Sequence, residues 1–226
     1  MVSADFLTTV PIFSDLTPEQ LSPLATKLRR RNYQRGEVIF HQDDPADRMH
    51  IVVDGRVRIS IASEDGREKD IALLQPGECF GEMALLDGSR RSATATATEA
   101  SQTFVLSQQD FMDFLEEHPE VVAKTTNLLT RRLRSVNQML GDLAFLDVPT
   151  RVAKQLLELA DTYSRDEDKE TIEVPLSQDE LARLVGASRE TISRALNSYR
   201  RLGILTTSHR LITIIDRKAL ERMASF

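Results

Sequence analysis

Cysteine is almost absent from this chain of 226 residues, in which Cys79 is the only one. A single thiol excludes an internal disulfide, a CxxC redox pair and an iron-sulfur cluster held by four thiolates of one chain. We expect Cys79 to be a small buried hydrophobe, which is the usual environment of a free cysteine.

Long apolar runs are also absent, since none approaches the roughly 20 residues that a membrane-spanning helix needs. The N-terminal stretch MVSADFLTTVPIF lacks the basic start and continuous apolar core of a secretory signal. The sequence therefore predicts a cytoplasmic protein with no membrane partner. The histidines are scattered without metal-ligand spacing, so we predict no bound metal; they are His41, His50, His118 and His209.

Positive charge is scarce overall but gathers near the C-terminus. The formal net charge is -6, yet residues 175–226 hold nine Lys/Arg against five Asp/Glu, a local charge of +4 that leaves -10 for the preceding residues. The chain is therefore not a uniformly basic nucleic-acid binder, and its C-terminal part is electrostatically distinct. The polar segment Asp161 to Glu173 before it predicts an exposed loop.

Residues 33–107 carry short apolar bursts separated by turn signals. The bursts VIFHQ, MHIVVDG, RVRISIA, DIALLQPGE and SQTFVLS alternate or are rich in β-branched residues, and DDP, DG, EDG and PG bound them. Such spacing predicts a barrel or jelly roll. A helix capped by Thr17 should precede the strands, and one capped by Ser107 should follow them. Together with the helical C-terminal part, this predicts an α+β fold.

A long helix is predicted from Pro119 to Leu143. A largely apolar set of positions falls alternately four and three residues apart, which is a heptad seam; they are Val122, Thr126, Leu129, Leu133, Val136, Leu140 and Leu143. The seam favours a parallel homodimer, with Leu129, Leu133, Val136, Leu140 and Leu143 at the interface. The alternative is that the seam packs on the chain's own β domain. We place a domain boundary near Leu146 to Pro149, which gives domains at 1–118, 119–146 (dimerisation helix and hinge) and 147–226.

The stretch LSQDELARLVGASRETISRALNSYRRLGIL has the pattern of two short helices joined by a glycine turn. Ser177 and Glu180 form a capping box, Gly186 makes the turn and Ser188 caps the second helix. ILTTSHRLITIID then alternates like a two-stranded wing. The sequence thus predicts a winged helix-turn-helix that binds double-stranded DNA.

The second helix of such a motif enters the major groove with its N-terminal residues. Arg189 and Arg194 can each donate two hydrogen bonds to guanine, and Glu190 can accept from cytosine. Hydroxyls can bind phosphates and fix the register. The predicted DNA-binding residues are Ser177, Gln178, Ser188, Arg189, Glu190, Thr191 and Arg194. The alternative is a helical hairpin with a solvated charged face, in which Glu190 pairs with Arg194.

The stretch FGEMALLDGSRRSATATA, Phe80 to Ala97, suits a phosphorylated sugar. A turn entering a short helix exposes backbone amides, an arginine fork can bind a phosphate, and a buried carboxylate can accept from a sugar hydroxyl. The predicted ligand-binding residues of this stretch are Gly81, Glu82, Met83, Arg91 and Ser92. The alternative is a Glu82 to Arg91 ion pair that only stabilises the loop.

Three motifs in order, FGEMALLDGSRRSA, LAFLDVPTRVAKQLLELA and GASRETISR, resemble the cyclic-AMP receptor (CRP/FNR) family of bacterial transcription regulators over nearly the full length. The resemblance implies a cyclic-nucleotide-binding jelly roll in which Gly81 and Glu82 hold the ribose while Arg91 and Ser92 bind the cyclic phosphate. It also implies that Val136 and Asn137 of the long helix meet the purine. Val136 departs from the family pattern because it offers no hydroxyl to an adenine amino group.

The resemblance further implies cyclic AMP as effector, with cyclic GMP open, and a TGTGA half-site in an inverted repeat. RNA polymerase is an implied partner, through a surface near the Asp161 to Glu173 segment. Constitutive DNA binding without an effector is an alternative. Two other classes remain: a metal-dependent enzyme built on the β domain, and a cyclic-nucleotide module that regulates a protein without DNA. We predict a regulator and no enzyme.

Overall fold

The structure is a computed structural model that describes residues 3–63, 68–163 and 171–225. By internal contacts the chain divides into two compact units, residues 1–135 and residues 136–226. The division falls inside the long helix α5 (Pro119–Phe145), so this helix supplies residues to both units. The domain boundary near Leu146 to Pro149 stays a prediction.

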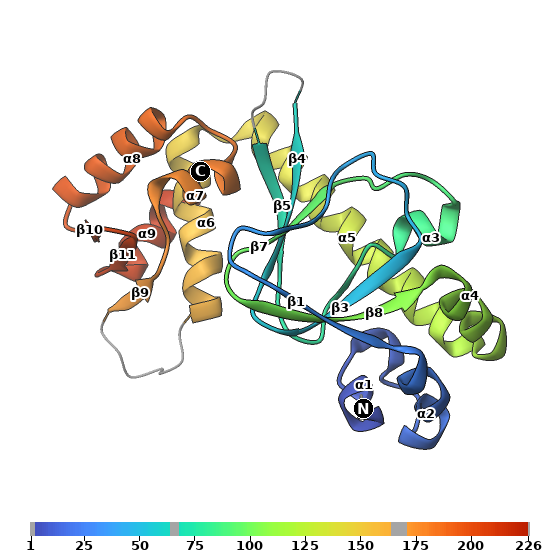
Figure 1. Ribbon diagram of the computed structural model, residues 1–226. Coiled ribbons are helices and arrows are strands. Elements are labelled where there is room, and N and C mark those ends of the chain that lie inside the picture. Colours follow the sequence, from blue (N-terminus) through green and yellow to red (C-terminus); the bar gives the residue numbers. More distant parts are fainter. Residues whose placement is uncertain (1–2, 64–67, 164–170, 226) are drawn as a thin grey trace. The chain divides into compact units, whose positions relative to one another are not determined.

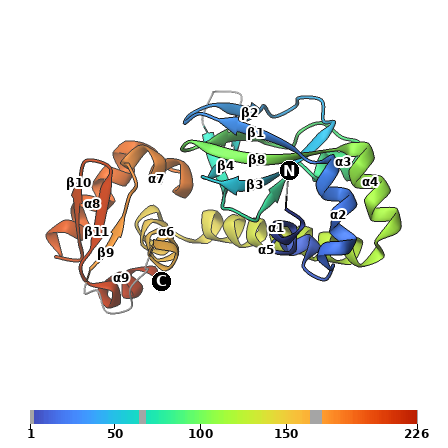
Figure 2. The same ribbon diagram turned by 60° about the horizontal axis from the view of Figure 1, so that its bottom comes forward.

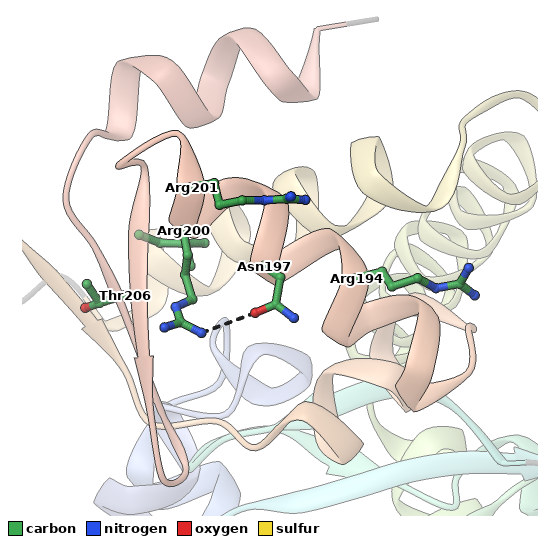
Figure 3. A pocket seen from close by; sticks show the side chains of 6 residues that line it. Arg194, Asn197, Arg200, Arg201 and Thr206 are labelled. Carbon is green, nitrogen blue, oxygen red and sulfur yellow. Dashed lines mark hydrogen bonds between the residues drawn. The ribbon is translucent and has the colours of Figure 1, made fainter.

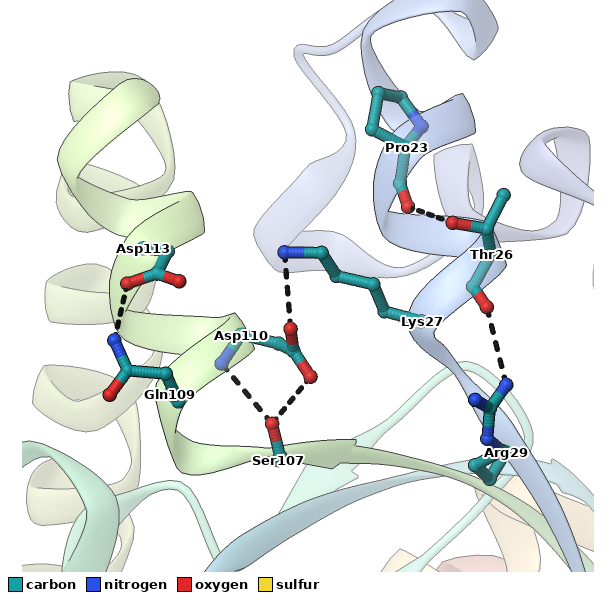
Figure 4. A network of polar contacts seen from close by, with 8 residues as sticks. All are labelled: Pro23, Thr26, Lys27, Arg29, Ser107, Gln109, Asp110 and Asp113. Carbon is teal, nitrogen blue, oxygen red and sulfur yellow. Dashed lines mark hydrogen bonds and ion pairs between the residues drawn. The ribbon is translucent and has the colours of Figure 1, made fainter.

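Short helices flank the β domain of the first unit. They are α1 (Ala4–Thr8), the 3-10 helix η1 (Pro11–Phe13), α2 (Pro18–Lys27) and α4 (Gln108–Glu117). Both predicted caps are confirmed: Thr17 forms a capping box with Gln20, and Ser107 accepts from the Asp110 backbone N–H at 3.2 Å. Lys27 then links α2 to α4 through Asp110 at 3.1 Å (Figure 4).

Two antiparallel four-stranded sheets form the β domain (Figure 1). One has the order β1 (Arg29–Tyr33), β8 (Ser101–Ser107), β3 (Arg48–Asp54) and β6 (Cys79–Phe80). The other has the order β2 (Val38–Phe40), β7 (Thr94–Ala97), β4 (Val57–Ala62) and β5 (Glu68–Leu74). The jelly-roll prediction is confirmed, and the two sheets are not closed into a barrel.

Apolar side chains fill two cores in this unit. Between the sheets lie Val52, Val57, Leu74, Phe80 and Ala95. A larger core joins β3 and β8 to the helices α1, α2 and α4, which lie together in both views (Figures 1 and 2). Cys79 is buried here as predicted, and burial raises the pKa of its thiol to about 12. A thiol with this pKa stays protonated and unreactive at neutral pH.

Helix α5 presents two apolar faces. Val121 and Leu128 pack into the core of the first unit, and Thr125 between them is buried. The predicted seam lies on another face, where Leu133 is 61% exposed and Leu140 is 58% exposed. The helix thus contacts its own unit through Val121 and Leu128, which counts against the alternative that the seam packs on the chain's own β domain.

The second unit contains the predicted helix-turn-helix. Its elements are α6 (Val148–Tyr163), β9 (Ile172–Val174), α7 (Gln178–Val185), α8 (Arg189–Arg201), β10 (Leu205–Ser208), β11 (Leu211–Ile214) and α9 (Arg217–Ala224). Its core is built around Leu156, Leu181, Ile192, Leu196 and Ile212. Tyr199 donates from its hydroxyl to the Pro149 carbonyl at 2.8 Å and so joins α8 to the start of α6.

The wing differs from the prediction. β10 and β11 form the expected hairpin, but β9 pairs with β11 and makes a three-stranded sheet of order β10, β11, β9. The segment predicted as an exposed loop therefore ends in a strand, because Ile172 and Val174 can pair with Ile214 and Ile212. The same segment begins inside α6, and its residues 164–170 lie outside the described part. No helix among the described residues is long and apolar enough to cross a membrane.

Candidate effector and nucleic-acid sites

The turn after β6 brings three predicted ligand residues together. Gly81 has a φ of +80°, Glu82 precedes the short helix α3 (Met83–Asp87), and Arg91 returns beside the turn. Arg91 donates from Nη1 to the Gly81 carbonyl at 2.8 Å. The positive φ favours glycine here, and a Cβ at Gly81 would lie 2.5 Å from Arg91 Nη1 and displace the end of that side chain.

Glu82 is fully buried, with 0% exposure. Its Oε1 accepts a hydrogen bond from Arg132 of α5, whereas its Oε2 is buried without a partner. Burial raises the pKa of this carboxyl, and Arg132 opposes the shift. The ion pair of Glu82 is thus made with Arg132, so the described contacts do not contain the alternative pair with Arg91.

Arg91 is 3% exposed, yet no carboxylate pairs with it among the described ion pairs. Its Nη1 and Nη2 donate to the carbonyls of Gly81 and Arg48, and its guanidinium lies 4.1 Å from the ring centroid of Phe40. Its Nε is buried without a partner. Burial lowers the pKa of the guanidinium from its ordinary value. The site therefore holds one buried acceptor and one buried donor that are both unsatisfied.

A small cavity of about 180 Å³ opens beside Arg91, with Phe40 and His50 among its lining residues. This volume lies below the roughly 300 Å³ at which small-molecule pockets begin, so the cavity has room for an anion-sized group. His50 is buried, stacks on Phe80 at 4.9 Å, and has its Nδ1 3.3 Å from Thr103 Oγ1. Burial, with Arg91 as a second cause, lowers the pKa of His50 to about 3, so its ring is neutral.

The other predicted ligand residues lie outside these contacts. Met83 begins α3 and is exposed, and Ser92 is exposed beside Arg91. Val136 and Asn137 lie on α5 within the second unit and are both exposed. Their contact with a purine stays a prediction. Among residues 3–63, 68–163 and 171–225, no three His, Cys, Asp or Glu side chains cluster as a metal site would require.

Arg132 is the site residue that the sequence interpretation missed. It extends the buried face of α5 at the helical spacing of Thr125 and Leu128, and it also donates to the Cys79 carbonyl. The sequence did contain a signal for this role, because Arg132 is a cation on the face of α5 whose other residues are buried. It was hidden because Arg131 directly before it and Arg134 two residues after it are the same residue type in the sequence.

The helix-turn-helix is built by the local signals that predicted it. Ser177 caps α7 and forms the capping box with Glu180, and Gly186 ends α7 with a φ of +73°. Ser188 caps α8, with its Oγ 3.2 Å from the Thr191 backbone N. Glu180 also accepts from Arg210 at 2.7 Å, which ties α7 to the wing.

The residues predicted to read bases are exposed in the first half of α8. Arg189 is 3.5 Å from Asp179, and Arg194 is 3.7 Å from Glu190, which is the pair that the solvated-face alternative expected. All four side chains are more than half exposed, so each pair is worth less than about 1 kcal/mol and can exchange for contacts with bases. The pairs are therefore compatible with a DNA-reading surface.

A jelly roll with a buried Glu–Arg turn, a long helix and a winged helix-turn-helix together define a ligand-controlled DNA-binding regulator. Comparison with known families agrees: a cyclic nucleotide-binding domain matches residues 30–118, and a Crp-like helix-turn-helix domain matches residues 150–223. The second match covers the part that a cyclic-nucleotide module without DNA would lack.

Relatives match over nearly the whole chain. The chain is 33% identical to a CRP-like cAMP-activated global transcriptional regulator of Mycobacterium tuberculosis, over 97% of this chain and 99% of the relative. It is 35% identical to the cyclic AMP receptor protein of Thermus thermophilus, over 95% and 96% of the two chains. The solved structure of the c-di-GMP responsive global regulator of Xanthomonas campestris has the same fold, with a TM-score of 0.81 at 24% identity, over 88% and 99% of the two chains.

The chain belongs to the CRP/FNR family of transcription regulators. It is a cyclic-nucleotide-responsive, DNA-binding regulator, and its relatives confirm the prediction of a regulator rather than an enzyme.

Proposed function

We propose that the protein is a homodimeric transcription regulator controlled by cyclic AMP and directed to a TGTGA-N6-TCACA-like palindrome. The observation that carries the effector assignment is the pair of unsatisfied atoms in the turn. Glu82 Oε2 is a buried acceptor without a donor, and Arg91 Nε is a buried donor without an acceptor. A ribose hydroxyl and a cyclic phosphate would satisfy both, and leaving such groups unpaired is costly.

In this proposal Gly81, Glu82 and Met83 line the ribose while Arg91 and Ser92 bind the phosphate. Arg91 is suited to that role because backbone carbonyls and an aromatic face hold it, so no carboxylate has to be displaced. The cyclic AMP activation named for the Mycobacterium tuberculosis relative supports adenine over guanine. Cyclic GMP is the second candidate, because the isopropyl group of Val136 cannot accept a hydrogen bond from an adenine amino group.

The exposed seam of α5 supports the homodimer. Leu133, Val136, Leu140 and Leu143 are exposed apolar residues at heptad spacing, and a second copy of the helix would bury them. Leu129 is half-buried at the start of the seam. A twofold dimer places two recognition helices on one duplex, which is what an inverted repeat requires.

On the DNA, Arg189 and Arg194 read guanines and Glu190 accepts from cytosine. Ser177, Gln178, Ser188 and Thr191 contact phosphates. Cyclic nucleotide favours the DNA-binding arrangement only by its higher affinity for that arrangement. We also propose that the regulator acts in the cytoplasm and contacts RNA polymerase.

The test is the anisotropy of a labelled TGTGA-N6-TCACA duplex titrated with protein at fixed salt, with no effector, cyclic AMP or cyclic GMP. Tightening by cyclic AMP on this duplex, and not on a scrambled one, is expected. Equal affinity in all three conditions would remove the effector switch. Arg189→Ala should cost about 1 to 3 kcal/mol and relax specificity at one base pair.

Two variants test the roles proposed for residues of the effector pocket. Arg91→Lys keeps the charge but loses the planar fork, so most of the cyclic AMP response should disappear. Val136→Thr restores a hydroxyl and should favour cyclic AMP over cyclic GMP more than the wild type does. An unchanged response of Arg91→Lys would contradict the phosphate assignment, and an unchanged ratio for Val136→Thr would contradict the purine assignment.

A further inference from the structure

A basic depression of about 760 Å³ lies between the second half of α8 and the strand β10 (Figure 3). Its lining residues are Arg194, Asn197, Arg200, Arg201, Leu205 and Thr206. Leu205 is buried and forms part of the floor, whereas the polar residues are exposed. This cluster contains three arginines and no acidic residue. Of the three arginines, only Arg194 is among the base-reading residues predicted above.

The periodicity of α8 places part of this cluster on the DNA-reading face. Ile192, Leu196 and Tyr199 are buried and define the face that packs into the core. Spacings of four, three and four residues put Glu190, Arg194, Asn197 and Arg201 on the opposite face. Arg200 lies to one side of that row, where it donates to Asn197 Oδ1 at 3.2 Å.

Along this face of α8, the residues that read bases are separated by distance from the residues that can contact phosphates. From Arg194 to Arg201 the helix rises about 10 Å, at roughly 1.5 Å per residue. The major groove is only about 12 Å wide, so a helix that reads bases with residues 189 to 194 has its later residues at the wall of the groove. The wall of the groove is formed by phosphates.

Charge at the end of α8 agrees with an anionic partner. No ion pair among the described residues involves Arg200 or Arg201, in contrast to the pairs of Arg189 and Arg194. Arg200 therefore has donors left over beside its bond to Asn197, and Asn197 keeps its amide donors free to bind an acceptor. A phosphate oxygen matches these groups, and guanidinium forks bind it well.

We propose that Arg200 and Arg201, with Asn197 and Thr206, form a phosphate-binding surface that holds the DNA backbone next to each half-site. The contacts are independent of sequence and add to the base contacts of Arg189, Glu190 and Arg194. The proposal rests on DNA binding by α8. It does not depend on the identity of the half-site or of the effector.

A competing explanation is that the two arginines only stabilise the C-terminus of α8. Cations in the last turn interact favourably with the helix dipole, and Arg200 and Arg201 are in that turn. This explanation predicts a lower melting temperature for their variants but no change in the salt dependence of DNA binding. The two explanations are therefore distinguishable in one set of variants.

The experiment measures the affinity of the full-length protein for a TGTGA-N6-TCACA duplex and for a scrambled duplex, with cyclic AMP, between about 50 and 200 mM salt. The variant is Arg200→Gln/Arg201→Gln. The matched control is Lys218→Gln/Arg222→Gln, which removes two exposed cations from α9, a helix that packs on α6. Arg200→Lys/Arg201→Lys keeps the charge.

Each lost phosphate contact should reduce the slope of log affinity against log salt by about 0.9, so four contacts per dimer should reduce it by up to about 3.6. The fold-loss of affinity in the variant should therefore be up to about 150 times larger at the lower salt than at the higher salt. The loss should be equal on both duplexes, since phosphates carry no sequence information. The Lys variant should keep most of the slope.

A slope equal to that of the wild type and of the α9 control would overturn the proposal, whatever the melting temperature. A loss confined to the specific duplex would also overturn it, because the arginines would then read bases. If the wild type binds both duplexes equally, the assigned palindrome is wrong, but the slope on either duplex still tests the phosphate surface.

Discussion

The Glu82 to Arg132 pair allows a quantitative prediction for Arg132→Met. The carboxylate is fully buried, and Arg132 is its side-chain partner, while its second oxygen has none. Methionine keeps an unbranched side chain and a similar helix propensity, but it is shorter and removes the charge. The variant therefore leaves a buried carboxylate without a compensating cation.

Breaking a buried ion pair by removing one partner costs about 3 to 5 kcal/mol. The Arg132 side chain is 31% exposed, so solvent already screens part of the interaction. We expect the free energy of unfolding to fall by about 2 to 3 kcal/mol at neutral pH. Arg134→Met, an exposed change on the same helix, should cost less than about 0.5 kcal/mol.

The penalty should depend on pH in a defined direction. Burial already raises the pKa of Glu82, and without Arg132 the pKa rises further. In the window between the ordinary pKa and this raised pKa, the folded state binds more protons than the unfolded state, so stability falls as pH rises. The penalty of Arg132→Met is thus smallest below the ordinary pKa of a glutamate and complete above the raised one.

Urea denaturation followed by circular dichroism at about pH 4, 5.5 and 7 measures this dependence. The double variant Glu82→Gln/Arg132→Met removes the buried charge and should recover most of the loss. Equal destabilisation of the single and double variants, or a penalty that does not change with pH, would refute the assignment of Arg132 as the partner of a buried charge.

Three further predictions concern the turn, the seam and the buried histidine. Gly81→Ala should weaken cyclic AMP binding roughly tenfold, because a Cβ would lie 2.5 Å from Arg91 Nη1 and the φ of +80° strains any other residue; calorimetric titration measures this, and wild-type affinity would contradict it. Leu140→Glu should give a folded monomer in sedimentation velocity, since like charges would meet across the seam; a stable dimer would sink the seam assignment. His50→Phe should reduce acid sensitivity: the pKa of about 3 means that only the unfolded state takes up a proton, so wild-type stability falls as pH drops from about 6.5 towards 3. Identical dependence of the urea midpoint on pH in both proteins would rule this out.

The features that the sequence predicted correctly depend on neighbouring residues. Ser177 with Glu180, Gly186 and Ser188 determine the ends of α7 and α8 by hydrogen bonds and a φ of +73° that involve only nearby backbone. Such signals are readable because capping and turn preferences act within a few residues. Thr17 and Ser107 in the first unit follow the same rule.

The features that the sequence did not reveal depend on distant residues. β9 has only three residues, and it becomes a strand because β11 offers an edge to pair with. The helix α9 follows the wing and covers α6, and only its N-cap by Asp216 is a local signal. Arg132 could not be separated from Arg131 by composition, because what distinguishes it is the carboxylate at Glu82.

The two apolar faces of α5 explain why one of them was visible in the sequence and the other was not. The seam repeats over Leu129, Leu133, Val136, Leu140 and Leu143, so its periodicity is strong. The inner face has only Val121, Thr125 and Leu128 before it reaches Arg132, and the polar residues Ser135 and Asp142 at its later helical positions weaken the pattern. Arg132 thus ends the face that packs on the β domain, next in sequence to the seam residue Leu133. Glu82 therefore contacts α5 through Arg132, which precedes the seam residue Leu133, so the predicted effector-binding turn touches the helix that carries the proposed dimer interface.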